Sequence, residues 1–147
     1  MAKIKLGARP QHITRTITAT MPDGTVGAIE ARYRYRTRVE FGAFIDERVA
    51  AAKAKAAAEA EAFSQSVRAA VEAGQPTPEP AAFSVAGQQR ESRDANAAYL
   101  LDILDGWNLD EPLSLDSARQ LCDEAPGMAQ ALIDGYREAV VEGRLGN

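Results

Sequence analysis

Two residue types that often act as nucleophiles or bases occur once each in this chain, as His12 and Cys122. His12 falls on the polar face of a predicted strand, where we expect a solvated side chain. Cys122 stands in an apolar helical context that is typical of a packed thiol. A Cys–His pair would have to form across the whole fold, and no Ser-His-Asp set follows from the spacing. Because structural zinc needs about four nitrogen or sulfur ligands, we predict no metal, no cofactor and no enzyme.

Carboxylates that could in principle bind a cation gather in one segment: Asp102, Asp105, Asp110, Glu111 and Asp116. The twelve-residue calcium loop requires oxygen ligands at alternating positions and glycine at the sixth. A loop starting at Asp105 has Trp107 at its third position and Asp110 at its sixth, so the template fails. We interpret Asp102 and Asp105, one helical turn apart, as a solvated helix edge. The scattered glycines form no phosphate-binding loop.

A cluster of arginines, which we call the electrostatic patch, is a stronger candidate for a functional site than the catalytic or metal-binding residues above. Arg32, Arg34 and Arg36 alternate along one predicted strand, and Arg38 follows. Arginines on a strand can bind phosphates, and a two-stranded ribbon can enter a nucleic-acid groove. The net charge of −4 argues against general nucleic-acid affinity. We therefore expect an acidic protein surface, including another copy of this chain, to be the better partner.

The element that positions these arginines is a β-hairpin. Apolar residues alternate with threonines from Ile13 onward, with Arg15 as the one misfit on the apolar face, and Pro22-Asp23-Gly24 has the composition of a three-residue turn. The resulting register pairs Ile17 with Ile29 and Ile13 with Tyr33, and puts these four side chains on one face. Because both strands agree on which side is apolar, the register is well specified.

A long helix follows the hairpin. Thr37 and Glu40 have the spacing of a capping box, and residues 50–62 contain nine alanines, which favour helix by propensity. Gly74 is a suitable C-terminal cap. The helix would measure about 54 Å at 1.5 Å per residue. Its first turns carry an apolar face.

Beyond the linker Gln75–Pro80, the sequence predicts about three shorter helices. The first runs from near Glu91 to Asp105 and is apolar around most of its circumference, so we expect it to form the hub of the fold. Ser114 can cap a helix over 115–124, and Pro126 suits the first turn of a final helix.

The predicted fold class is α+β and mostly α, with an N-terminal β-hairpin, one long helix and a C-terminal helical lobe. The predicted segments are 1–74, a Pro/Ala-rich linker at 75–88, and 89–147, with one shared core. No apolar run approaches the ~20 residues that span a bilayer, and the N-terminus does not have the pattern of a signal peptide. A single cysteine suits a reducing cytoplasm.

Three segments of the sequence resemble those of tail assembly chaperones of long-tailed bacteriophages. They are Tyr33-Arg-Tyr-Arg-Thr-Arg38 followed by Glu40-Phe41-Gly42, the segment Tyr99–Ser114, and the ending Glu142–Asn147. The resemblance implies a non-enzymatic protein that binds the tape measure protein and keeps it soluble while tail tube subunits polymerise around it. Such chaperones are absent from the finished particle, which implies a location in the cytoplasm of the infected or lysogenic bacterial host.

The implied partners are the tape measure protein, the tail tube protein and a longer, frameshifted form of the chain itself, and we also expect a homo-oligomer. A client helix could dock on apolar anchors at helical spacing, and tryptophan is favoured at binding hot spots. The candidate partner-binding residues are Phe41, Phe44, Ile45, Val49, Trp107, Leu109 and Leu113. An alternative is that these residues only pack the core. Two other functions stay open: a structural phage tail component, or a nucleic-acid-binding regulator that uses the arginines.

Overall fold

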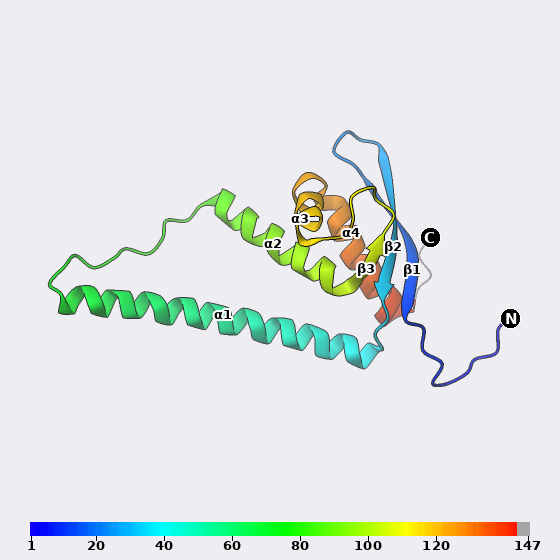
Figure 1. The fold of residues 1–147 in the computed structure, drawn as a ribbon, viewed down its shortest axis with the longest axis horizontal. Helices are drawn as coiled ribbons and strands as arrows, with labels where there is room; N and C mark the ends of the chain where they lie inside the picture. The colour runs from blue at the N-terminus through cyan, green and yellow to red at the C-terminus, as the bar shows by residue number, and fades with distance from the viewer. Residues whose placement is uncertain (144–147) are drawn as a thin grey trace. The chain divides into compact units, whose positions relative to one another are not determined.

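The computed structural model describes residues 1–143, and the chain divides into two compact units (Figure 1). Unit 1 comprises Met1–Arg38 and Ala86–Asn147, and unit 2 comprises Val39–Val85. The hairpin thus belongs to the same unit as the C-terminal lobe, whereas the sequence grouped it with the long helix in 1–74. Residues 144–147, part of the C-terminal segment in the resemblance, lie outside the described residues.

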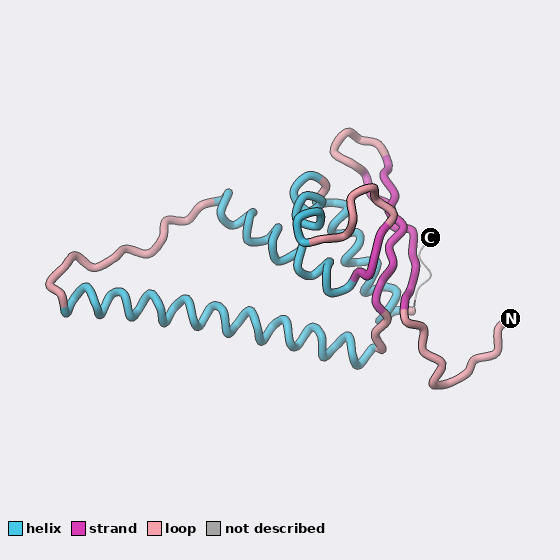
Figure 2. The backbone as a smooth tube through the Cα atoms, viewed as in Figure 1, coloured by secondary structure: helices cyan, strands magenta, loops and turns pink. Residues whose placement is uncertain are grey.

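The predicted fold class is confirmed: a hairpin, one long helix and three C-terminal helices (Figure 2). The elements are β1 (His12–Thr20), β2 (Val26–Arg34), α1 (Arg38–Glu72), α2 (Val85–Ile103), β3 (Leu104–Trp107), α3 (Leu115–Glu124), α4 (Pro126–Arg137) and the π-helical turn η1 (Glu138–Glu142).

The hairpin has the predicted register, with Ile17 opposite Ile29 and Ile13 opposite Tyr33. Its turn is held by Asp23, whose Oδ1 accepts hydrogen bonds from the Thr25 backbone N–H at 2.9 Å and the Thr25 hydroxyl at 2.6 Å. The hydrogen bond from the Thr25 hydroxyl, and to a smaller extent the one from the Thr25 N–H, lowers the pKa of Asp23 because both favour its charged form. The turn chemistry thus fixes which side of both strands faces the core.

The core of unit 1 lies between the apolar face of the hairpin and α4. Tyr33 and Tyr136 are fully buried with their ring centroids 5.3 Å apart, and the Tyr33 hydroxyl donates to the Leu132 carbonyl oxygen at 2.7 Å. Gly135 allows the close approach, because a Cβ there would lie 2.6 Å from Ile17 Cδ1. The predicted final helix therefore covers the sheet.

The hub helix is shorter than the sequence predicted at its C-terminal end. α2 ends at Ile103, and Leu104–Trp107 form a third strand on β2, in the order β1-β2-β3. Gly106 has a low helix propensity, and two arginines satisfy carbonyl groups around the helix end, since Arg36 donates to Asp102 O and Arg34 to Leu104 O. The prediction of helix to Asp105 was wrong for this physical reason.

The helix that we expected to be the hub of the fold, α2, is also less buried than the sequence predicted. Ala97, Leu100 and Ile103 are the buried residues of α2, while Tyr99 and Leu101 are half-buried. The helix therefore presents one apolar face to the core, and its remaining circumference is at least partly wet.

Unit 2 contains α1, a continuous helix of 35 residues that is about 53 Å long. Gly74 follows it in the left-handed region, with φ +66°, and the Gln75 N–H donates to the Ala70 carbonyl at 2.9 Å, as a glycine C-terminal cap predicts. An extended loop then leads to α2 (Figure 2). α1 lies wholly within the described residues, and Phe44 is its one buried side chain.

Candidate functional site

The Trp107 segment is the first candidate surface. Trp107 ends β3 and pairs with Ala31 of β2, and the Asn108 side-chain oxygen accepts the Glu30 N–H at 2.9 Å, which extends the ladder by one bond. The indole N–H donates to the Glu111 carbonyl at 2.7 Å. The indole is therefore held in place by its own loop and remains half-exposed.

A shallow cavity of about 130 Å³ opens beside this indole. Its apolar lining comes from Trp107, Leu109 and Leu121, and the acidic residues Glu111 and Glu124 also line it. The volume is well below the 300 Å³ or more typical of sites for drug-sized ligands. The cavity has room for a single apolar side chain, with two acidic residues beside it.

Leu113, the third residue predicted in this segment, is half-buried and does not line the cavity. Leu121 of α3, which does line it, was missed by the sequence reasoning. The sequence carried little indication of this, because a loop and half a helix separate Leu121 from Trp107 and only the tertiary fold brings the two side chains together. α3 itself is set by the predicted Ser114 cap, where Ser114 and Ser117 exchange side-chain to backbone hydrogen bonds.

The second candidate surface lies on α1. Phe44 is only 7% exposed, and its ring contacts the Phe41 ring, with centroids 6.2 Å apart, and the Arg48 guanidinium. Ile45 is half-buried, whereas Val49 is 47% exposed. The four predicted residues are thus not equivalent, and Val49 is the one most available to a partner.

Val49 belongs to a longer apolar stripe, which we call the α1 stripe. Its members are Ile45, Val49, Phe63, Val67 and Val71. At about 100° per residue these positions fall within an arc of about 80° and extend for about 39 Å along the helix. Phe63 and Val71 are 38% and 63% exposed. Between Val49 and Phe63 this arc carries Ala56 and Ala60, with Lys53 at its edge, so the middle of the stripe is narrow enough for another helix to approach closely.

The electrostatic patch has partners within its own unit. Arg32 donates to Asp105 at 3.1 Å, and the same Asp105 oxygen lies 2.8 Å from His12 Nδ1. Arg34 donates to a backbone carbonyl of β3, and Arg36 donates to the Asp102 carbonyl and to the Tyr136 hydroxyl. These arginines hold the sheet to the end of α2.

Arg38, the first residue of α1, is exposed. The carboxylate of Asp105, expected on a solvated helix edge, is instead shared by two cationic or hydrogen-bonding partners. Among residues 1–143 no group of three metal-ligating side chains comes together, and no helix in this range has the apolar length to cross a bilayer.

Comparison with known proteins gives one match. A family model described as phage tail assembly chaperone matches residues 1–147. No curated protein and no solved structure matches the chain significantly.

Proposed function

This chain belongs to the phage tail assembly chaperone family, and we propose that its client is the tape measure protein, which it binds and keeps soluble during tail assembly. We propose further that it acts without catalysis in the cytoplasm of the bacterial host and is absent from the finished particle. The tail tube protein and a longer, frameshifted form of the chain are its other proposed partners.

The observation that carries this proposal is the α1 stripe. Apolar side chains that gather on one side of a surface mark a candidate interaction site, and Val49, Phe63 and Val71 are exposed at 38–63% on one side of α1. A helical client supplies what this surface requires, since helices pack side by side at 8–10 Å through such ridges. The alanines at the middle of the stripe favour the shorter distance.

The Trp107 cavity is the proposed second anchor. It is lined by apolar side chains and by two acidic residues, Glu111 and Glu124, and a client side chain placed there would exclude water from the exposed side of the indole. Buried aromatic anchors of this kind contribute about 2 kcal/mol or more when they are binding hot spots.

The test is co-expression with the tape measure protein from the same genome, measured as the soluble and co-purifying fraction of that protein. We expect Val49→Asp and Phe63→Asp to lower this fraction, because each puts a charge in the stripe. Ala58→Asp is the matched control: it is exposed and lies on the opposite side of α1 from Val49, at about 180°. Far-UV circular dichroism checks that all three variants remain helical.

Equal loss in all three variants, or no loss in any, would remove the stripe from the proposal. Trp107→Ala tests the second anchor in the same assay. Mass spectrometry of purified virions tests the proposed absence from the particle, because a structural tail component would be abundant there. The inward hydrogen bonds of Arg32, Arg34 and Arg36 give no support to a nucleic-acid regulator.

A further inference from the structure

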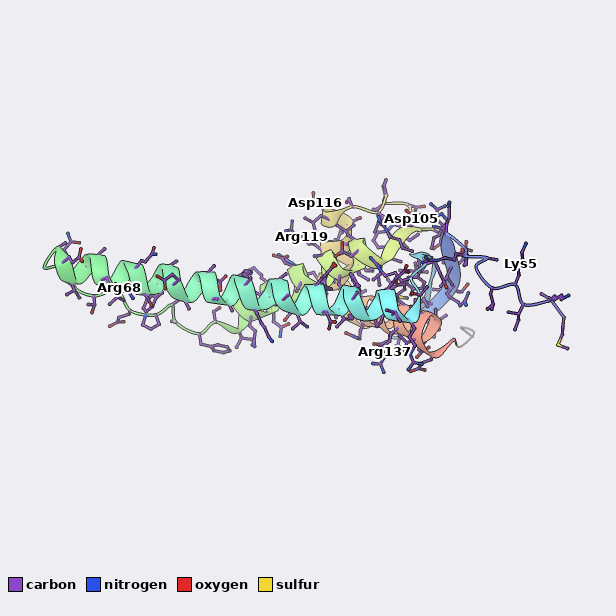
Figure 3. All side chains as sticks on the ribbon, turned by 90° about the horizontal axis from the view of Figure 1, so that it is seen from below. Lys5, Arg68, Asp105, Asp116, Arg119 and Arg137 are labelled. Atoms are coloured by element: carbon purple, nitrogen blue, oxygen red, sulfur yellow. The ribbon has the colours of Figure 1, made fainter. Side chains whose placement is uncertain are left out.

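The N-terminal arm, residues 1–10, is exposed throughout and contains neither helix nor strand. Its sequence nevertheless has the two-residue alternation of a strand that buries one face, with Ile4 and Leu6 on one side and Lys3 and Lys5 on the other. Ile4 and Leu6 are 88% and 93% exposed, and Figure 3 shows Lys5 on the arm, away from the sheet of unit 1. The arm is patterned for a sheet that it does not join within its own copy.

The same unit presents an open strand edge. β1 is the first strand in the order β1-β2-β3, so its outer side has no neighbouring strand among the described residues. The hydrogen bonds from Met21 N to Thr25 O and from Tyr35 N to Gln11 O show that the odd-numbered residues of β1 bond to β2. Hydrogen-bonded pairs alternate in antiparallel ladders, so the even-numbered residues direct their backbone groups outward.

Part of this edge is covered by the chain itself. The Arg15 guanidinium donates to the Thr14 carbonyl at 2.9 Å, which occupies the first half of the edge. The segment Thr16–Thr20 remains, five residues long, and its polar face carries only threonines. The alternating segment Lys3–Leu6 of the arm fits within this length.

We propose that the arm of one copy adds to the β1 edge of a second copy as a fourth, antiparallel strand, over Lys3–Leu6 on the arm and Ile17–Thr20 on the edge, with Leu6 opposite Ile17 and Ile4 opposite Ala19. Ile4 and Leu6 then lie on the apolar face of the sheet beside Ile17, and the two lysines lie among threonines. Backbone hydrogen bonds along the edge supply the affinity, as in other strand additions.

We take the strand to come from a second copy, because residues 9–11, at the base of the arm, are held away from the β1 edge of the same copy. The Arg9 guanidinium lies over the Tyr35 ring, 5.5 Å from its centroid, and the Gln11 carbonyl accepts the Tyr35 N–H. The first contact holds Arg9 of the arm against the residue that follows β2, and the second continues the β1–β2 ladder to Gln11, whereas the open edge is the outer side of β1. Folding back onto the same copy would require these contacts to break.

The first test is the sedimentation of the full-length chain without any client. We expect a concentration-dependent oligomer whose dissociation constant rises at least about tenfold in the double variant Ile4→Asp/Leu6→Asp. Ala8→Asp is the control, because Ala8 is exposed and lies outside the proposed strand, and its dissociation constant should not change. On the edge, Thr18→Pro removes an outward N–H and should weaken association, while Thr18→Val keeps that N–H and should not. The Thr18→Pro variant should still fold, because proline is tolerated at a sheet edge where the replaced N–H faces solvent.

The second test identifies the occupant. Two proteins, one carrying Ile4→Cys and the other Ala19→Cys, both with Cys122→Ala, are mixed under oxidising conditions. We expect a disulfide-linked dimer of the two. A monomeric wild type, an oligomer indifferent to the arm variants, or a disulfide that forms only when both cysteines share one chain would each overturn the proposal. None of these results bears on client binding, which the co-expression assay measures separately.

Discussion

Gly135 lies inside α4 at the point where the helix approaches the hairpin most tightly. An added Cβ would lie 2.6 Å from Ile17 Cδ1 and 3.0 Å from the Tyr33 hydroxyl oxygen. Both neighbours are buried, and the Tyr33 hydroxyl is fixed by its bond to Leu132. Gly→Ala in an open helix stabilises by about 1 kcal/mol, whereas overpacking a core costs about 1–3 kcal/mol. We therefore expect Gly135→Ala to lower the free energy of unfolding by about 1 kcal/mol.

Urea unfolding followed by circular dichroism measures this change. Gly127→Ala is the control, because the nearest atom to its added Cβ is the Thr20 carbonyl oxygen at 3.8 Å, an ordinary contact. Ile17→Val removes the clashing Cδ1 atom and alone costs about 0.5–1.5 kcal/mol. The double variant should then be more stable than the sum of the two single changes. A Gly135→Ala protein more stable than wild type, or strict additivity, would refute the reasoning.

Three further predictions concern single side chains. Burial raises the pKa of the Tyr33 hydroxyl above its ordinary value of 10, so the stability it contributes is present below about pH 10 and is lost as pH rises above it. Tyr33→Phe should flatten the alkaline decline by up to about 1.4 kcal/mol per pH unit, and an unchanged slope would contradict this. Burial also raises the pKa of the Cys122 thiol, so a disulfide reagent at pH 8 should react more than about tenfold faster with the urea-unfolded chain than with the native one; equal rates would exclude a buried thiol. Ser114→Ala removes the cap of α3 and should cost about 1 kcal/mol in urea unfolding, whereas no loss would show that the cap does not matter.

The parts of the fold predicted from sequence are those determined locally. The hairpin register follows from the alternation around Ile17 and from a turn whose residues each have a conformational reason. The length of α1 follows from its composition and from Gly74 at its end. Neither required knowledge of what the element packs against.

The parts that the sequence did not predict depend on distant segments. Leu104–Trp107 continue an apolar helical pattern, and only pairing with β2 and the donors from Arg34 and Arg36 make them a strand. The arginines were placed on the correct face of the hairpin, but their partners lie 66 to 100 residues away along the chain. Likewise, the half-exposed Trp107 becomes a candidate site only when Leu121 of α3 lies beside it.

The proposed client interaction can be measured directly with purified proteins. The tape measure protein, unfolded in urea, is diluted into buffer with increasing amounts of this chain, and light scattering reports its aggregation. We expect that scattering is suppressed as the chain approaches stoichiometric amounts, that the Ala58→Asp variant suppresses it equally, and that the Phe63→Asp variant does so much less. Scattering unaffected by the wild-type chain at any ratio would contradict the proposal that this protein keeps the tape measure protein soluble.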